Sequence, residues 1–430
     1  MRLRDCSVLV TIILSLSRGP VDEDSSAFLT EPQANLTVSP ADPPSVAVSA
    51  DGRYIAFTSC IRLTAADTND HPDLYVVDRT TRNVTLETPS PVRAPDHGSP
   101  HLSGDGRLLI YETGTEGEAG RVLVLRDRST GTSRTIAPPN AEPNGPSRDP
   151  SISADGRSVL FTSAATNLVD APDANGTSED VYRYDLPSGT ISRVSLDHAG
   201  RQLPVGASFA ASVSADGRYV AFSSTAALDG KVTPSRGPRP TVALYLRDLI
   251  ASTTTRIVAR RDGTPPDASS YDAAISGDGR YVAFVSEAAD LVRGDINRTA
   301  DIFLFDANTR TTELVSRSEN GGSANGTSRH PDISLDGRVV SFQSDASDLT
   351  CLRRCAAETR DINLVPDVFV YDVRTRIVRR ISTGSRSWSE PSIGPSIDGT
   401  GAVIAFSSRH PRDSRDDAND YDLFVRLPVK

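Results

Sequence analysis

The sequence predicts an all-β chain that folds as a single β-propeller of four-stranded blades. Three observations lead to this fold class. One short segment recurs along the chain, each recurrence is followed by four strand-like runs, and helical periodicity is nearly absent. A four-stranded unit that repeats every 50 to 62 residues is the pattern of a propeller. Seven copies predict seven blades, with six or eight blades as the alternatives.

The recurring segment is Ser-x-Asp-Gly-Arg followed by an apolar run that ends in Phe or Tyr. Asp-Gly between two strand-like runs is a strong hairpin signal, because glycine accepts the positive φ of tight turns. The six regular copies begin at Ser49, Ser103, Ser153, Ser214, Ser276 and Ser334. A degenerate seventh copy, SIDGTGAVIAF, begins at Ser396.

The fifth unit displays its four predicted strands most clearly. They span Ala273–Ser276, Tyr281–Ser286, Asp301–Asp306 and Thr312–Ser316. The seventh unit ends the chain at its third strand, YDLFVRL, and has no fourth strand of its own. The segment Asn35–Ser39 resembles a fourth strand, so we expect it to complete the last blade and close the ring. The propeller would then span residues 35–430.

The N-terminal region has the features of an export signal. Residues 1–17 combine Arg2 and Arg4 with an apolar run that is too short to span a bilayer. We therefore expect a signal peptide over 1–17, a polar linker over 18–34, and a secreted or periplasmic protein. No other segment is apolar enough to cross a membrane. The net charge of −10 argues against binding to nucleic-acid phosphates.

A second pattern lies between the second and third strands of five units. The pattern is D-x-N-x-x-x-D or a variant one residue longer or shorter, and units two and four lack all three residues. Alternating carboxylates and amides are ligands for Ca²⁺, whereas the same residues also form Asx-turns without a metal. Both interpretations stay open. The calcium candidates are Asp67, Asn69, Asp73, Asp173, Asn175, Asp180, Asp295, Asn297, Asp301, Asp361, Asn363 and Asp367. The variant in unit seven has Asp417, Asn419 and Asp422.

The remaining residues with potential chemistry give weaker signals. In a secreted protein Cys351 and Cys355 could form a small disulfide loop; the alternatives are free thiols or pairing with Cys60. The six histidines share no repeat position, and several lie on loops, where we expect them at the surface. We expect the arginines of the Asp-Gly-Arg turns to pair with nearby carboxylates, and the aromatic residue that ends each repeat to pack between blades. The chain contains no G-x-S-x-G, no H-E-x-x-H and no phosphate-binding glycine loop.

The repeat S-x-D-G-R-x-x-A-F-x-S, followed by D-[IV]-[FY]-x-x-D, resembles that of TolB-like bacterial propellers. The resemblance covers roughly residues 35–428 and implies the propeller fold, whereas it says little about function, because related propellers also occur as gating domains of prolyl-oligopeptidase-like hydrolases. TolB itself carries a separate α/β domain before its propeller, and this chain has no room for one. We therefore expect a propeller that binds a protein, a peptide or a cell-envelope glycan, with no required cofactor. The alternative is a propeller hydrolase or lyase with a metal, such as calcium, in or near the central channel.

Overall fold

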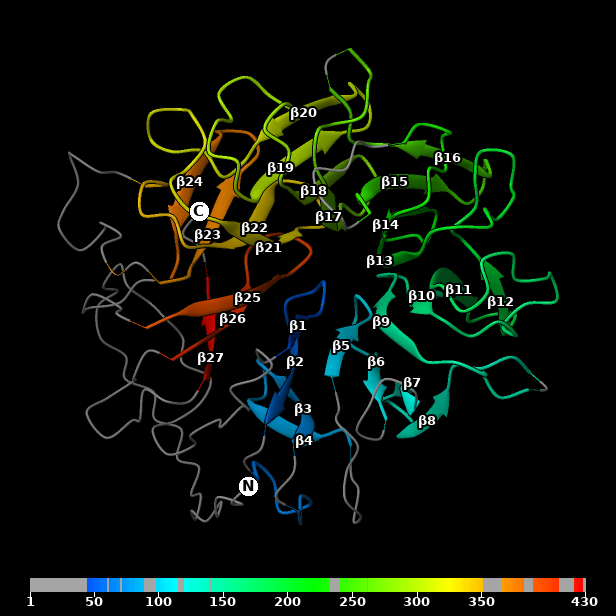
Figure 1. The fold of residues 1–430 in the computed structure, drawn as a ribbon. Helices are drawn as coiled ribbons and strands as arrows, with labels where there is room; N and C mark the ends of the chain where they lie inside the picture. The colour runs from blue at the N-terminus through cyan, green and yellow to red at the C-terminus, as the bar shows by residue number, and fades with distance from the viewer. Residues whose placement is uncertain are drawn as a thin grey trace, which may run out of the picture.

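The computed structural model describes residues 45–427 except 60–61, 70–71, 89–97, 115–119, 140, 233–239, 261, 351–362, 364, 383–389 and 410–420. These residues form seven consecutive antiparallel sheets arranged in a ring (Figure 1). The predicted signal peptide, the linker, the closing strand Asn35–Ser39 and the cysteines 351 and 355 lie outside the described residues. In the described part of the chain no helix is long and apolar enough to cross a membrane.

The strands follow one another along the chain: blades 1 to 6 each use four in sequence order, and blade 7 uses three among the described residues. Blades 1 and 2 contain β1 (Val46–Val48), β2 (Tyr54–Ser59), β3 (Asp73–Asp78), β4 (Asn83–Leu86), β5 (Gly98–Leu102), β6 (Leu108–Thr113), β7 (Val122–Asp127) and β8 (Thr132–Thr135). Blades 3 and 4 contain β9 (Ser147–Ile152), β10 (Ser158–Ser163), β11 (Asp180–Asp185), β12 (Thr190–Arg193), β13 (Ser208–Val213), β14 (Tyr219–Ser224), β15 (Ala243–Asp248) and β16 (Thr253–Arg256). Blades 5 and 6 contain β17 (Ser270–Ile275), β18 (Tyr281–Ser286), β19 (Asp301–Asp306), β20 (Thr311–Leu314), β21 (Ser328–Ile333), β22 (Val339–Ser344), β23 (Asp367–Asp372) and β24 (Ile377–Arg380). Blade 7 contains β25 (Ser392–Ile397), β26 (Ile404–Ser408) and β27 (Asp422–Arg426).

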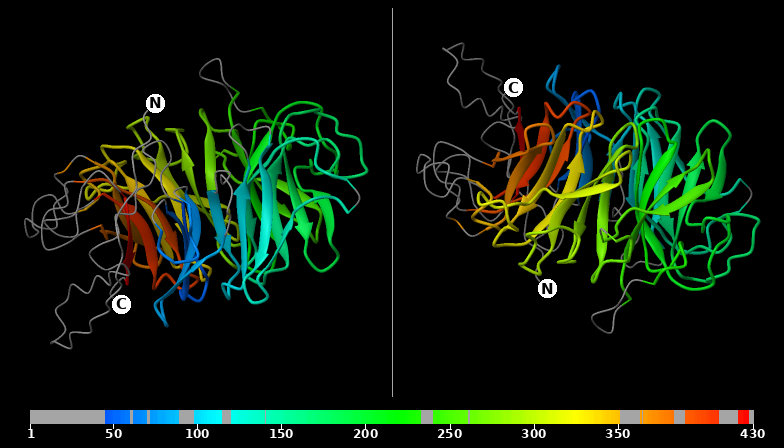
Figure 2. Two further views of the ribbon diagram at one scale, coloured as in Figure 1. Left: turned by 90° about the horizontal axis from the view of Figure 1, so that it is seen from below. Right: turned by 90° about the horizontal axis from the view of Figure 1, so that it is seen from above.

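The predicted all-β, seven-bladed propeller is confirmed. The first strand of every blade lies nearest the centre of the ring, and later strands lie progressively farther out (Figure 1). Seen edge-on, the blades stand side by side in a flattened ring (Figure 2). Blade 7 has three strands among the described residues, and the segment predicted to supply a fourth lies outside them, so that part of the prediction stays untested.

The Ser-x-Asp-Gly-Arg repeat is explained by the turn that joins the first two strands of a blade. In blade 1 the Ser49 hydroxyl donates to Asp51, and it accepts a hydrogen bond from the backbone nitrogen of Tyr54 at 2.9 Å. Gly52 takes a φ of 68°, which side chains disfavour. The Arg53 guanidinium then pairs with Asp78 at 2.7 Å. The same arginine pairs with the aspartate that ends the third strand in blades 2, 4 and 5.

Blade 7 departs from the register that the sequence predicted. Its turn glycine is Gly401, with a φ of 73°, and the Gly401 nitrogen donates to the carbonyl of Asp398. Asp398 therefore takes the place that Ser334 has in blade 6, where Gly337 donates to it. The prediction that Asp398 is the turn aspartate was wrong by two residues. The sequence SIDG resembles the motif, but it lies two positions before the residues that form the turn.

The hydrophobic core lies between neighbouring blades rather than inside a single layer. One cluster joins Ile55 and Phe57 of blade 1 to Val403 and Ala405 of blade 7. The repeat aromatics are buried, as predicted, and six of them pair with an aromatic ring on the adjacent third strand at 5.7 to 6.0 Å. Burial of these rings between blades stabilises the ring as a whole, since each blade needs both neighbours.

A ring of backbone hydrogen bonds joins all seven blades at the Asp-Gly turns. It passes through the residue after each motif serine, or its equivalent in blade 7: Ala50, Gly104, Ala154, Ala215, Gly277, Leu335 and Gly399. The last bond runs from the Gly399 nitrogen to the Ala50 carbonyl at 2.9 Å. Most of these positions hold glycine or alanine, and at the glycines the neighbouring backbone leaves no room for a side chain. A Cβ on Gly277, for example, would lie 2.8 Å from the Leu335 carbonyl oxygen.

Candidate functional site

The innermost strands enclose a central channel with a cavity volume of about 550 Å³. Its wall includes residues of all seven blades. The turn ring, with Ala50, Gly104, Leu335 and Gly399, lines the channel at one end. The opposite mouth lies on the face where the innermost strands begin and the second strands end, because each such pair is antiparallel. This is also the face of the loops that carry the D-x-N pattern.

A β-bulge near the start of the innermost strand shapes this mouth. In blades 2 to 7 the pairing with the second strand shifts at this point, and one residue takes a positive φ. Bulges re-aim side chains and are frequent beside functional sites. Asp and His tolerate this backbone conformation better than most residues do. The bulge residues are Ser99, Asp149, Ala210, Asp272, His330 and Gly394.

Two of these residues, Asp272 and His330, face each other across the seam between blades 5 and 6. Their side chains are 43% and 53% exposed, and His330 Nδ1 lies 3.7 Å from Asp272 Oδ2. Burial raises the pKa of Asp272, while His330 opposes that shift. The pair is therefore accessible from the channel and combines a carboxyl group with an imidazole.

Asp149 lies on the seam between blades 2 and 3, within a network of charges. Its carboxylate pairs with Arg148, and its backbone nitrogen donates to Glu112 at 2.7 Å. Arg148 also pairs with Glu179 at 2.6 Å. Burial raises the pKa of Asp149 to about 6, and Arg148 only partly offsets this effect. At neutral pH this carboxylate is ionised but poorly solvated.

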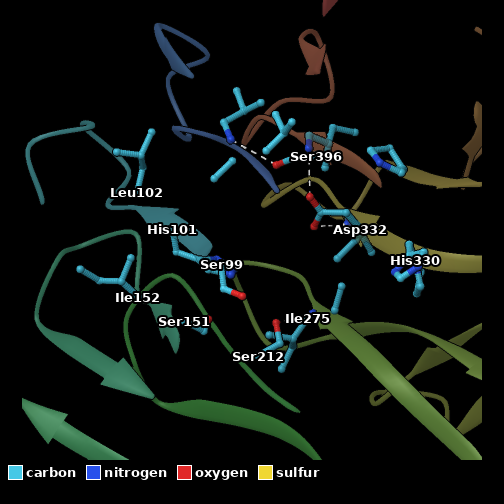
Figure 3. Close-up of a pocket in the computed structure, with 18 of the residues that line it drawn as sticks. Ser99, His101, Leu102, Ser151, Ile152, Ser212, Ile275, His330, Asp332 and Ser396 are labelled. Atoms are coloured by element: carbon cyan, nitrogen blue, oxygen red, sulfur yellow. Dashed lines mark hydrogen bonds between the residues drawn. The ribbon is translucent and has the colours of Figure 1, made fainter. Parts of the chain in front are cut away.

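A second layer of polar residues lies two positions farther along the innermost strands (Figure 3). Ser212, Asp332 and Ser396 each accept a hydrogen bond from a backbone nitrogen of the next blade, at 2.9 to 3.2 Å. Burial raises the pKa of Asp332 to about 6, against the effect of its hydrogen bonds. His101 occupies the same layer. Loss of solvent inside the ring lowers the pKa of His101 to about 4, so its imidazole is neutral.

The channel residues correct one expectation from the sequence. His101 and His330 lie on the innermost strands β5 and β21 and line the channel, so the default of a histidine on a surface loop does not apply to these two. Asp149, Asp272 and Asp332 were not singled out at all. Counting back from each motif serine would have placed these residues on the channel wall, because strand periodicity fixes which positions face inward.

The D-x-N loops lie apart from one another, each in its own blade, and the structure does not gather them into one site. Where described, they share one hydrogen-bonded local structure. The aspartate that begins the third strand accepts a hydrogen bond from a hydroxyl after the fourth strand. The pairs are Asp73 with Thr88, Asp180 with Ser195, Asp301 with Ser316 and Asp367 with Ser382.

Asparagine completes the loops in different ways. Asn69 and Asn363 donate to the third-strand aspartates Asp73 and Asp367 at 3.0 and 3.1 Å. Asn175 and Asn297 donate instead to backbone carbonyls of Gly206 and Ala324. Asp361, Asp417 and Asn419 lie outside the described residues, as does the side chain of Asp422. Among the described residues no group of three or more His, Cys, Asp or Glu residues is arranged to hold a metal.

Comparison with known proteins shows likeness in fold alone. No family model matches the chain, and no curated protein matches it. An oligogalacturonate lyase from Vibrio parahaemolyticus matches with a TM-score of 0.55 and 14% identity, covering 92% of this chain and 93% of that one. The propeller domain of the Trilobed protease from Pyrococcus furiosus matches with a TM-score of 0.54 and 11% identity, covering 90% and 97%.

TolB structures are also among the matches. TolB from Acinetobacter baumannii is 19% identical with a TM-score of 0.43, covering 78% of this chain, and the chain spans 65% of that protein's length. The resemblance that the repeat predicted is confirmed as one of fold, which the seven consecutive sheets show by themselves. One fold hosts many unrelated functions, so function must be argued from the channel.

Proposed function

We propose that this propeller is a binding module whose central channel takes a cationic group of a protein or peptide partner. One observation carries the proposal. The described residues that line the channel include Asp149, Asp272 and Asp332 but no lysine or arginine, and of the three only Asp149 is already paired with an arginine, Arg148 beside the wall. A concave site lined by one sign of charge concentrates the field and attracts groups of the opposite sign.

The state of these carboxylates supports a cationic ligand. Burial has removed part of the water that would solvate Asp149 and Asp332, which is why their pKa values are raised to about 6. At neutral pH both remain ionised. An ammonium or guanidinium group entering the channel would replace the lost hydration with charge-assisted hydrogen bonds. The amino terminus of a chain, or a lysine or arginine side chain, has this chemistry.

The same charges disfavour acidic ligands. Oligogalacturonate, the substrate named for the lyase of the same fold, carries a carboxylate on each sugar and would meet the channel carboxylates. A neutral cell-envelope glycan would lack the groups that these carboxylates attract. We therefore favour a protein or peptide over a glycan. The secreted or periplasmic setting stays a prediction that rests on residues 1–17.

The Asp272–His330 pair supports a second candidate function, a hydrolase or lyase. A carboxylate beside an imidazole, both open to a channel, is an arrangement that general acid–base catalysis uses. Acidic or histidine residues that one or two blades alone contribute to the channel mouth favour an enzyme, and this pair is such a feature. Cleavage of bound peptides, detected by mass spectrometry and lost in His330→Gln, would favour the enzyme.

Binding is tested by fluorescence anisotropy with labelled peptides of equal length that are lysine- and arginine-rich, neutral, or acidic. We expect the cationic peptide alone to bind, and each of Asp149→Asn, Asp272→Asn and Asp332→Asn to weaken its binding by about tenfold. Glu142→Gln is the matched control, because Glu142 is an exposed carboxylate outside the channel wall. Equal affinity for acidic and cationic peptides, or equal loss in the control, would contradict the proposal.

A further inference from the structure

The D-x-N loop of blade 5 contains three buried oxygen atoms that have no hydrogen-bond partner. They are Asp295 Oδ1, Thr299 Oγ1 and Asp301 Oδ2. The two aspartates are 6% and 0% exposed. Burial of a carboxylate oxygen without a hydrogen-bond donor destabilises the folded state. Two such oxygens in one seven-residue loop indicate that a positively charged group binds there.

Blade 3 shows what supplies that group elsewhere. There Arg193, the last residue of β12, lies 3.3 Å from Asp173 and 3.4 Å from Asp180. Gln202 donates further hydrogen bonds to both carboxylates, at 2.9 and 2.6 Å. In blade 6 the equivalent Arg380 of β24 pairs with Asp367 at 3.1 Å. A buried arginine therefore neutralises the loop in these two blades.

In blade 1 a hydroxyl group, and not an arginine, is the donor to the loop aspartate. The side chain of Tyr75 on β3 donates to Asp67 Oδ2 at 2.5 Å. Leu86 occupies the arginine position of that blade. Each loop whose two aspartates are both described thus receives a donor from the third strand, the fourth strand, or both, except in blade 5.

Blade 5 has lost both donors. Phe303 stands where blade 1 has Tyr75, and Leu314 stands where blade 3 has Arg193. Neither replacement can donate a hydrogen bond to the two aspartates. Asp301 keeps the Ser316 hydroxyl, which donates to its other carboxylate oxygen at 2.6 Å.

We propose that the Asp295–Asp301 loop binds one Ca²⁺ ion, which takes the place of the arginine found in blades 3 and 6. The three unpartnered oxygens and the Asn297 side-chain oxygen would supply ligands from carboxylates, a hydroxyl and an amide. Ca²⁺ accepts such a mixed, irregular set of oxygens, whereas Mg²⁺ demands a near-ideal octahedron. This site is separate from the channel, so the proposal does not depend on the channel's ligand.

The surrounding contacts assign the ion a structural role. The backbone of this loop is tied to the segment that leads into blade 6. The Ser323 nitrogen donates to the Gly294 carbonyl at 3.0 Å, and Asn297 donates to the Ala324 carbonyl at 2.8 Å. An ion held by Asp295 and Asp301 would therefore stiffen the connection between blades 5 and 6.

The test uses the full protein, stripped with EDTA and dialysed, in calorimetric titrations with CaCl₂ or MgCl₂. We expect one Ca²⁺ per chain, Mg²⁺ binding at least about tenfold more weakly, and a higher thermal unfolding midpoint in Ca²⁺ than in EDTA. Leu314→Arg rebuilds the arrangement of blade 3, so it should fold in EDTA and lose both Ca²⁺ binding and the midpoint shift. Asp301→Asn should lose Ca²⁺ binding as well.

Asp67→Asn is the matched control, since it alters the equivalent loop of blade 1 and should leave the Ca²⁺ stoichiometry at one. Absence of Ca²⁺ binding by the wild-type protein would overturn the proposal. So would Ca²⁺ binding that survives in Leu314→Arg, or that is lost in Asp67→Asn while that variant stays folded. Equal affinity for Mg²⁺ would overturn the assignment to calcium.

Discussion

The hydroxyl of Ser396 accepts a hydrogen bond of 3.1 Å from the backbone nitrogen of Val48, 348 residues earlier in the chain. This bond joins the innermost strands of blades 7 and 1. Two further contacts cross the same seam, the backbone bond between Gly399 and Ala50 and the hydrophobic cluster of blades 1 and 7. The described residues thus close the ring from its inner edge, where the channel needs a continuous wall.

Loss of the Ser396 hydroxyl should weaken this closure. In Ser396→Ala the Val48 nitrogen loses its partner, so we expect the free energy of unfolding to fall by about 1–2 kcal/mol. Urea unfolding followed by circular dichroism measures this change. Ser151→Ala is the control, because Ser151 occupies the same layer in blade 3 without an equivalent bond. Equal destabilisation of the two variants would show that the bond has no special part in closure.

The turn ring should tolerate no side chain at Gly277. A Cβ there would lie 2.8 Å from the Leu335 carbonyl oxygen, a backbone atom that cannot move without disturbing the next blade. We expect Gly277→Ala to destabilise the protein by about 1–3 kcal/mol in the same unfolding assay. Gly98→Ala, where nothing lies within 4 Å of the added Cβ, should leave stability nearly unchanged. If the two variants have the same urea midpoint, close packing of the ring does not restrict the side chain at residue 277.

The fold could be predicted from the sequence because each repeat carries its own turn chemistry. The Ser49 hydroxyl forms hydrogen bonds with Asp51 and with the backbone of Tyr54, all within one turn. Local sequence therefore determines local structure. The degenerate copy at Ser396 was misaligned because only tertiary contacts show that Gly401, and not Gly399, forms its turn.

The candidate site could be predicted only in part, for a related reason. The bulge position and the position two residues farther on hold different residues in most blades, so a search for what the repeats share passes over Asp149, Asp272 and Asp332. The loop of blade 5 lacks a donor because Phe303 and Leu314 are apolar. This matters only by comparison with Tyr75 and Arg193, which contact the loop aspartates of blades 1 and 3. Sequence reasoning identified the loop of Asp295 and Asp301 but could not separate it from the others.

Asp332 should make stability depend on pH. Its pKa is raised to about 6 in the folded protein, above the value of about 3.9 for an unfolded chain. Between these values the folded state binds more protons, so this residue makes the free energy of unfolding fall as pH rises. Urea unfolding from pH 7 to 4 should show the wild type gaining stability relative to Asp332→Asn as the pH falls. Parallel pH profiles would rule out this linkage.

Binding of a cationic peptide should respond to pH in the opposite sense. Asp149 and Asp332 must be ionised to attract the ligand, and both have pKa values of about 6. Lysine and arginine side chains keep their charge throughout this range. Anisotropy titrations at pH 7.5, 6 and 5 should therefore show affinity falling as the pH falls. Affinity that stays constant or rises at pH 5 would mean that these carboxylates do not hold the ligand.

The central claim, that the channel takes a cationic group, is tested most directly by photo-crosslinking. A short lysine- and arginine-rich peptide with a photoreactive group is bound, irradiated and mapped by mass spectrometry. We predict crosslinks on the innermost strands Ser147–Ile152, Ser270–Ile275 and Ser328–Ile333, lost in Asp149→Asn and Asp332→Asn and retained in Glu142→Gln. Crosslinks confined to the outermost strands, such as Thr132–Thr135 and Thr190–Arg193, would contradict the claim.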